Sequence, residues 1–291
     1  MNILLTGASG RIGSHTCRHL HEAGFAVRAV DRLPNPSLPV RLEVVNLLER
    51  EICYRLLDGM DAVVHLANHA AFQAGQVPQT VFNENVTMNM NVFQAACDMG
   101  VRKILFASSV QTFAVKNRLA LPDRIPELPF PYLPLDGWIP ARPVNPYGLS
   151  KQVSEEMLRY FVLTHGMAAV VLRFPRVLDE GIISRLRDRS AFPFDAVEEA
   201  FTYLHVHDAA RLIESCLRAD LAGYHPYLPS AQDIQVLAEL PTLVATHFSG
   251  IPWRDGKAPS VLVDISAITR ETGWTPSFNA LRKAGSGSSR A

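Results

Sequence analysis

Tyr147 and Lys151 stand four positions apart, so they lie on one face of a helix that we expect to continue to residue 164. A phenol with an ordinary pKa of ~10 is a poor base at neutral pH. A nearby ammonium group favours the phenolate, which brings the Tyr147 hydroxyl into range for proton transfer. Ser108 and Ser109 follow an apolar run, at the sheet edge where ligands bind in parallel sheets. These residues together indicate acid/base chemistry at a bound ligand.

A glycine-rich turn occupies residues 6–13, between the first apolar run and the first helical stretch. Glycine lets the backbone turn tightly and approach a pyrophosphate, and a helix N-terminus supplies free N–H groups and a positive dipole end. A strand before the turn and a helix after it form the context that a dinucleotide site requires. The turn residues expected at the pyrophosphate are Gly7, Gly10, Arg11, Ile12 and Gly13.

Asp31 ends the second apolar run, at the place where an acidic residue accepts the ribose hydroxyls of adenosine. A carboxylate at this place repels a 2′-phosphate, so NAD is favoured over NADP. NADP remains an alternative cofactor, because the guanidinium of either Arg11 or Arg32 can pair with the additional phosphate.

The elements that position these residues alternate between apolar runs and helical patterns. The apolar runs are continuous rather than alternating in polarity, which is typical of strands covered on both faces. The expected strands are residues 3–6, 26–30, 42–45, 62–66, 103–107 and 169–173. The expected helices are residues 11–23, 48–57, 79–99 and 151–164. Strands joined by crossover helices predict an α/β fold with a doubly wound parallel sheet of the Rossmann type.

Residues 116–145 interrupt this alternation, because their seven prolines exclude a helix or an interior strand. Such a long irregular connection is usually functional, as a lid or a binding loop. We expect residues 1–175 to form an NAD(P)-binding domain and residues 176–280 mainly a smaller substrate-binding lobe, interleaved with the last sheet elements. Residues 281–291 are expected to be a disordered tail. In the lobe, Asp208 is expected to be the N-cap of a helix over 209–217.

The composition argues against several classes of protein. Lys plus Arg and Asp plus Glu both number 28, so the chain has no excess of positive charge that would indicate binding to nucleic acid or to an anionic membrane. The four cysteines are far apart and form no CxxC pair, so no metal site is expected and a reducing cytoplasm is favoured. No run of about 18 apolar residues exists, so no membrane span is expected.

The order and spacing of several motifs resemble one known family over residues 1–278. Besides the turn, Asp31, the Ser pair and the Tyr–Lys pair, the matching positions are residues 65–68, Asn85, and residues 172–174, 203–208 and 273–276. This set resembles the extended short-chain dehydrogenase/reductase family, which is the NAD-dependent epimerase/dehydratase family of nucleotide-sugar epimerases, dehydratases and related dehydrogenases. The resemblance implies a sugar or nucleotide-sugar substrate and NAD as the carrier of hydride.

The resemblance also implies roles for individual residues. Tyr147 would be the acid/base, Lys151 would hold the nicotinamide ribose, and Ser109 would hydrogen-bond the reacting oxygen. The other implied cofactor contacts are Gly7, Gly10, Arg11, Ile12, Gly13, Asp31, Arg32, Asn46, Leu47, Leu66, Ala67, Asn68, Asn85 and Phe174. The implied substrate contacts are Ser109, Val110, Trp138, Tyr147, Arg176 and Arg254.

Departures from the family pattern concern the substrate. Phe201 and Thr202 replace an Arg-Asp pair that can meet a phosphate, whereas Arg254 stands where epimerases place a diphosphate-binding arginine. Arg176 is suited to grip a carboxylate or a phosphate. Trp138 either stacks on a sugar or base or holds the proline-rich loop down.

The sequence leaves the reaction open between an epimerase and a dehydrogenase, because the first half-reaction uses the same residues. The resemblance also makes dehydration less expected, because dehydratases of the family usually carry acidic residues in the segment after the Ser pair, and residues 110–113 carry none. The alternative from another class is a non-catalytic protein that binds a dinucleotide as a structural or regulatory ligand. The resemblance further implies a homodimer packed through the helices at 79–99 and 151–164 as a four-helix bundle.

Overall fold

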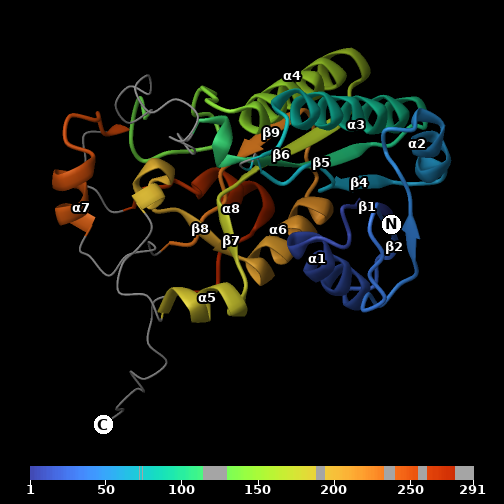
Figure 1. Cartoon of the computed structure of the whole chain (residues 1–291), viewed down its shortest axis with the longest axis horizontal. Coiled ribbons are helices and arrows are strands. Elements are labelled where there is room, and N and C mark those ends of the chain that lie inside the picture. Colours follow the sequence, from blue (N-terminus) through green and yellow to red (C-terminus); the bar gives the residue numbers. More distant parts are fainter. Residues whose placement is uncertain are drawn as a thin grey trace, which may run out of the picture.

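A seven-stranded sheet, parallel throughout, forms the centre of the molecule in the computed structural model (Figure 1). The structure describes residues 1–71, 73, 75–113, 130–187, 194–232, 240–254 and 261–278. The strand order is β3-β2-β1-β4-β5-β6-β9. The strands are β1 (Asn2–Thr6), β2 (Ala26–Asp31), β3 (Leu42–Val44), β4 (Ala62–His65), β5 (Lys103–Ser109), β6 (Ala168–Phe174) and β9 (Tyr224–Tyr227). The predicted doubly wound Rossmann-type sheet is confirmed, and each of the six predicted strands is present within two residues of its expected ends.

Helices cover both faces of this sheet. One face carries α1 (Arg11–Glu22), α6 (Val206–Arg218) and α8 (Ser266–Thr272), and the other carries α2 (Arg50–Leu57), α3 (Pro78–Asp98) and α4 (Pro146–His165). Figure 1 shows α3 and α4 side by side along one face and α1 with α6 along the opposite face. No helix in the described ranges is both long and apolar enough to cross a membrane.

The burial pattern of β1 explains why the strands read as continuous apolar runs. Ile3 and Leu5 lie in the core beneath α1 and α6, whereas Leu4 lies in the core beneath α2 and α3. Successive side chains of a strand point to opposite faces, so a strand covered on both sides must be apolar at every position.

The strand order creates a switch point between β1 and β4. From β1 the chain first builds outward to β2 and β3, and then returns to place β4 on the other side of β1. The connecting helices therefore lie on opposite faces, and a crevice opens at the carboxyl ends of β1 and β4. Thr6, at the end of β1, and His65, at the end of β4, are paired at this edge.

A smaller lobe lies beside the carboxyl edge of the sheet (Figure 1) and contains a parallel pair of strands, β7 (Arg176–Leu178) and β8 (Tyr203–His205). Its helical elements are α5 (Glu180–Arg187), η2 (Phe194–Glu199) and α7 (Leu240–His247), and η1 (Val110–Thr112) adjoins it from the end of β5. Because α6, β9 and α8 come after residue 175 but belong to the sheet layers, the lobe is interleaved with the last sheet elements.

The described part of the proline-rich segment is built into the lobe. Leu133 and Leu135 form single bridges with Trp253 and Val263 and are fully buried in the lobe core. The segment is irregular because of its prolines. Residues 130–139 nevertheless contribute side chains to the lobe core, although they precede residue 175, the predicted end of the cofactor-binding domain. Residues 116–129 of this segment and the predicted tail at 281–291 lie outside the described residues.

The start of α6 corrects one prediction. The helix begins at Val206 rather than at Ala209, and its N-cap is His205, whose Nδ1 accepts a hydrogen bond from the His207 backbone N–H at 3.3 Å. Asp208 lies in the first turn, where its fully buried carboxylate accepts from the backbone N–H groups of Ser277 and Phe278, each at 2.9 Å. These partners are about seventy positions away in the chain, so a local pattern cannot reveal them.

Candidate active site

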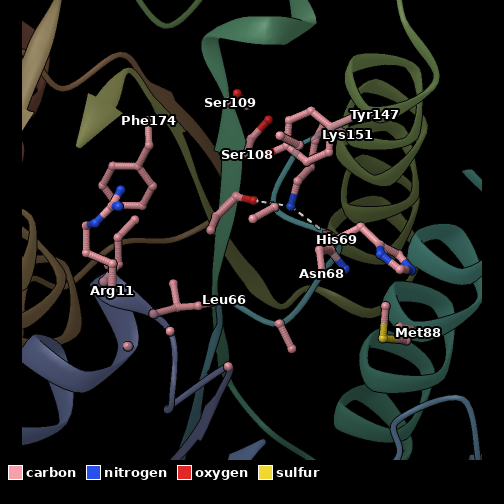
Figure 2. A pocket seen from close by; sticks show the side chains of 18 of the residues that line it. Arg11, Leu66, Asn68, His69, Met88, Ser108, Ser109, Tyr147, Lys151 and Phe174 are labelled. Atoms are coloured by element: carbon pink, nitrogen blue, oxygen red, sulfur yellow. Dashed lines mark hydrogen bonds between the residues drawn. The ribbon is translucent and has the colours of Figure 1, made fainter. Parts of the chain in front are cut away.

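A cavity of about 650 Å³ opens at the carboxyl ends of β1, β4 and β5 and continues to the lobe. Its volume is in the range of small-molecule and cofactor sites. Figure 2 shows Tyr147 and Lys151 extending from α4 toward Ser108 and Ser109, with Arg11 and Phe174 on the opposite side. Elements far apart in the sequence thus converge on one hollow at the switch point of the sheet.

The glycine-rich turn forms the floor at the β1 end of this cavity. Gly7 has a left-handed φ of +71°, and a Cβ on it would lie 2.7 Å from the backbone of Leu66 and Ala67. A Cβ on Gly13 would lie 2.0 Å from the carbonyl oxygen of Gly7. The turn therefore packs directly against the two residues that follow β4. The helix α1 begins at Arg11 without a side-chain cap, and its first residues line the cavity, so its first N–H groups are available there. This geometry suits the binding of a phosphate or pyrophosphate.

Asp31 lines the cavity at the end of β2, together with Arg32, Asn46 and Leu47. The Asp31 carboxylate accepts hydrogen bonds from the backbone N–H groups of Ser9, at 2.9 Å, and Leu33, at 3.0 Å. These contacts fix the carboxylate beside the glycine-rich turn, with acceptor capacity left for further hydroxyl groups.

The first turn of α4 brings Tyr147 to the end of β5. The helix starts with Pro146, and the Asn145 side chain caps it by accepting from the Gly148 N–H at 2.8 Å. A Cβ at Gly148 would lie 2.2 Å from the Gln111 carbonyl oxygen, so only glycine lets α4 approach the segment after β5 this closely. Tyr147 is buried as a result and makes a side-chain hydrogen bond with Ser109.

Lys151 is buried one helical turn further on. Its Nζ donates to Asn68 Oδ1 and to the Ala107 carbonyl oxygen, both at 2.6 Å (Figure 2). Burial lowers the pKa of Lys151 to about 7, although the Glu155 carboxylate acts in the opposite sense. Burial raises the pKa of Tyr147 to about 12, and the hydrogen bond with Ser109 partly opposes this shift. A phenol, an ammonium group and a hydroxyl thus converge at a site that can bind and protonate an oxygen atom.

The two serines of β5 have different partners. The Ser108 hydroxyl donates to Glu155, which also forms a buried ion pair with Arg173 at 2.7 Å. The Arg173 guanidinium in turn donates to the Ile139 carbonyl oxygen. Ser108 is thus engaged in a buried network beneath the site, whereas Ser109 is the serine in contact with Tyr147.

A second buried network holds Asn68, the acceptor of Lys151. Asn89 accepts from Asn68 Nδ2 at 2.8 Å and donates to Ser154 of α4 at 2.6 Å. His65 also bonds to Asn89, and burial lowers the His65 pKa to about 3, so the imidazole is neutral. The position of Lys151 therefore depends on polar residues of β4, α3 and α4 together.

Three of the residues expected at the site are not brought to the described cavity wall. Asn85 is fully buried, accepting from the His69 N–H at 2.7 Å and donating to Ser150 at 3.1 Å. Arg254 forms an ion pair with Asp136 and donates to the Pro134 carbonyl oxygen. Asn85, Trp138 and Arg254 thus lie outside the cavity wall, whereas the other expected residues all line it.

The place of Trp138 follows from the packing of the loop before it. Gly137 lies so close to β9 that a Cβ would be 1.9 Å from the Pro226 carbonyl oxygen. Trp138 is 59% exposed, and its ring lies beside Tyr224 and the Arg159 guanidinium. Because Trp138 lies outside the cavity wall, this position does not fit stacking on a substrate bound in the cavity.

Sequence reasoning missed several polar residues of the cavity. His69 and Glu84 line it as a pair, with 2.7 Å between Nε2 and Oε2. Gln111 and Glu199 also line it. Gln111 lies two residues after Ser109 and His69 directly follows the motif at residues 65–68, so both positions carried a usable signal. By contrast, η2 carries no motif that points to the site. No group of metal-binding side chains occurs among the residues for which the structure gives positions.

Comparison with known proteins gives a family match. The model of the "NAD dependent epimerase/dehydratase family" matches residues 3–226. An NAD-dependent glucose-6-phosphate dehydrogenase of Haloferax volcanii is 30% identical over 227 residues, which is 75% of this chain and 80% of that protein. A UDP-glucose 4-epimerase of Azospirillum brasilense is 29% identical over 59% of this chain, and the match spans 48% of its length.

Solved structures agree on the fold. A short-chain dehydrogenase/reductase superfamily protein from Agrobacterium tumefaciens with bound NAD has a TM-score of 0.70 at 21% identity, covering 96% of this chain and 94% of its own. A UDP-galactose 4-epimerase has a TM-score of 0.64 at 25% identity, covering 96% and 95%. At 21% identity, the likeness to the Agrobacterium tumefaciens protein establishes the fold alone, and this fold is of the Rossmann type.

Proposed function

The chain belongs to the NAD-dependent epimerase/dehydratase family, and we propose that it transfers hydride between NAD and a hydroxyl or keto group of a sugar, with Tyr147 as the acid/base. The observation that carries the proposal is the convergence of Ser109, Tyr147 and Lys151 at the cavity that begins at the glycine-rich turn. A non-catalytic dinucleotide-binding protein has no need for these three groups at one point.

The residues present fit the cofactor. In the proposal, the turn at Gly7–Gly13 and the N-terminus of α1 hold the pyrophosphate, and Asp31 accepts the adenosine ribose hydroxyls. Lys151 and Tyr147 would meet the nicotinamide ribose. The Asp31 carboxylate opposes a 2′-phosphate, so NAD is preferred to NADP. Bound NAD supplies the hydride acceptor, and the chain's own residues handle the proton.

The proton step falls to Tyr147. Its phenolic oxygen takes the proton of the substrate hydroxyl during oxidation and returns it during reduction, while the Lys151 ammonium stabilises the phenolate. The Ser109 hydroxyl donates a hydrogen bond to the same substrate oxygen. The raised pKa of Tyr147 in the protein without cofactor means that positive charge near the phenol is needed for this step at neutral pH.

The experiment that tests the proposal follows two signals at once. Purified protein with NAD is offered aldoses, uronic acids and nucleotide sugars, while NADH absorbance and the sugar epimers by NMR are recorded. Release of NADH in equal amount to oxidised sugar identifies a dehydrogenase, and epimers without net NADH identify an epimerase. If NAD binds but neither signal is seen with any sugar class, the catalytic proposal fails in favour of the non-catalytic alternative.

A further inference from the structure

We propose that Glu199 is a substrate-binding residue whose carboxylate accepts hydrogen bonds from sugar hydroxyls and selects a sugar without a nucleoside diphosphate. The inference rests on the proposed function and specifies its substrate class. Glu199 is 2% exposed and lines the same cavity as Ser109, Tyr147 and Lys151. It comes from the lobe, at the end of η2 (Phe194–Glu199), and was not expected from any motif.

Strand pairing places Glu199 on the catalytic edge. Ser109 pairs with Phe174 across β5 and β6, and Phe174 leads directly through Pro175 into β7. Arg176 of β7 pairs with Tyr203 of β8, so the residues just before β8 lie beside the end of β6. Among the positions that the structure describes, the end of β6 and the lobe together contribute Phe174, Pro175, Arg176, Val177 and Glu199 to the cavity wall.

The backbone after Glu199 is held in an unusual conformation. Ala200 and Phe201 both have left-handed φ values, of +50° and +54°, although neither is glycine. Such residues persist only where the surroundings enforce them, and they gather at functional sites. Here Phe201 is buried in the lobe core against Phe248, and the Thr202 N–H and hydroxyl both donate to the Glu199 carbonyl oxygen. The position of Glu199 is therefore fixed at the expense of backbone strain.

The charge of the cavity determines what a carboxylate here recognises. A carboxylate is an acceptor only, so it binds vicinal hydroxyls well and repels phosphate oxygens. The cation that we expected to meet a diphosphate, Arg254, forms an ion pair with Asp136. Arg11, at the cavity wall, forms an ion pair with Asp179 at 2.9 Å. Arg176 lies on the wall beside β6 and is suited to a single anionic group, so a free sugar and a sugar monophosphate both fit the proposal.

The chain offers a matched pair of variants. Glu199→Gln removes the charge and keeps the size of the side chain. Glu198→Gln makes the same change at the adjacent buried residue, which is not among the cavity-lining residues that the structure describes. In the NAD-loaded protein, we expect Glu199→Gln to lower kcat/KM for the accepted sugar roughly tenfold, mainly through KM, as for loss of a charged hydrogen bond. Glu198→Gln should leave kcat and KM unchanged.

The same aldose is then compared in three forms, as the free sugar, as its 6-phosphate and as its UDP ester. Turnover of the free sugar or of the 6-phosphate, at least roughly tenfold above the UDP ester in kcat/KM, supports the proposal and shows which of the two is used. A preference for the UDP ester in the wild-type protein overturns it.

Calorimetry with UDP tests the selection without turnover. We expect UDP to bind the NAD-loaded wild-type protein weakly, and Glu199→Gln to bind it roughly tenfold more tightly, because a like charge is removed. Equal affinities in both proteins would overturn the role of Glu199. This result is separate from failure of the proposed function, in which no sugar form is turned over although NAD binds.

Discussion

Burial shifts the pKa values of Tyr147 and Lys151 in opposite directions. It raises the pKa of the phenol to about 12 and lowers that of the ammonium group to about 7. Both shifts favour the neutral forms, because a low-dielectric site disfavours charge of either sign. A cofactor with a positive ring, bound beside both groups, would favour the phenolate. The two pKa shifts therefore describe a site in which proton transfer waits for the bound cofactor.

Removal of the phenolic hydroxyl tests the role of Tyr147 most directly. Tyr147→Phe should lower kcat by ~10²- to 10⁴-fold, the usual contribution of a positioned acid/base, while NAD binding persists. Steady-state kinetics and NAD titration by fluorescence measure the two effects. The control is Tyr160→Phe, the same change at a residue of α4 that is 54% exposed. Normal turnover of a confirmed substrate by Tyr147→Phe would disprove the mechanism.

The pKa of Lys151 predicts a pH dependence of stability in the protein without cofactor. In the unfolded chain a lysine has a pKa of ~10.4, whereas in the folded protein Lys151 has a pKa of about 7. Between these values the unfolded chain binds more protons, so the contribution of Lys151 to the free energy of unfolding rises with pH from 7 to about 10. Above pH 10 the raised pKa of Tyr147 acts oppositely, and stability is lost.

Urea unfolding at several pH values, for wild type and Lys151→Met, isolates this contribution. Methionine keeps an unbranched side chain of similar length and removes the titrating group. The difference in free energy of unfolding between the two proteins should change in favour of the wild type as the pH rises from 7 to 10. A difference that is constant over this window would show that Lys151 is charged in the folded protein throughout.

At the scale of elements, the glycine-rich turn is held by backbone contacts on two sides. A Cβ at Gly13 would lie 2.0 Å from the Gly7 carbonyl oxygen, and backbone atoms cannot move aside as a flexible side chain can. Gly13→Ala should therefore cost about 1–3 kcal/mol of stability and displace the start of α1. Because those N–H groups would hold the pyrophosphate, we expect NAD affinity to fall roughly tenfold or more.

Gly24→Ala provides the matched control. Gly24 has a φ of +83°, so alanine is strained there, but no atom lies within 4 Å of the added Cβ. We expect a loss of about 1–2 kcal/mol in stability without any change in NAD affinity. If both variants lost affinity equally, the effect at Gly13 would reflect general destabilisation rather than the geometry of the turn.

The elements that sequence predicted best are those with a local cause. Continuous apolar runs identified the strands, and proline or glycine residues marked the irregular segments. The start of α6 was missed because the partners of Asp208 are Ser277 and Phe278, far away in the chain. Likewise, Glu199 reaches the cavity only through the pairing of β7 with β8 and the burial of Phe201. Such long-range packing leaves no periodic or motif signal.

At the scale of the whole molecule, α3 and α4 lie together on one face, opposite α1 and α6 (Figure 1). Apolar side chains on these two helices are exposed, including Met90 at 40%, Leu149 at 44% and Leu163 at 86%. Exposed apolar side chains on adjacent helices are available to pack against a partner. They support the proposal that two copies associate through α3 and α4 as a four-helix bundle.

This proposal predicts that charge on the α3–α4 face breaks the assembly. The double variant Met90→Glu/Leu163→Glu should sediment as a monomer at a micromolar concentration at which the wild type sediments as a dimer. The reason is that association of the variant would bury two carboxylates per chain. Val44→Glu is the control, since Val44 is 58% exposed on the edge strand β3, away from these helices. A monomeric wild type would remove the proposal. A double variant that stays dimeric would place the interface elsewhere.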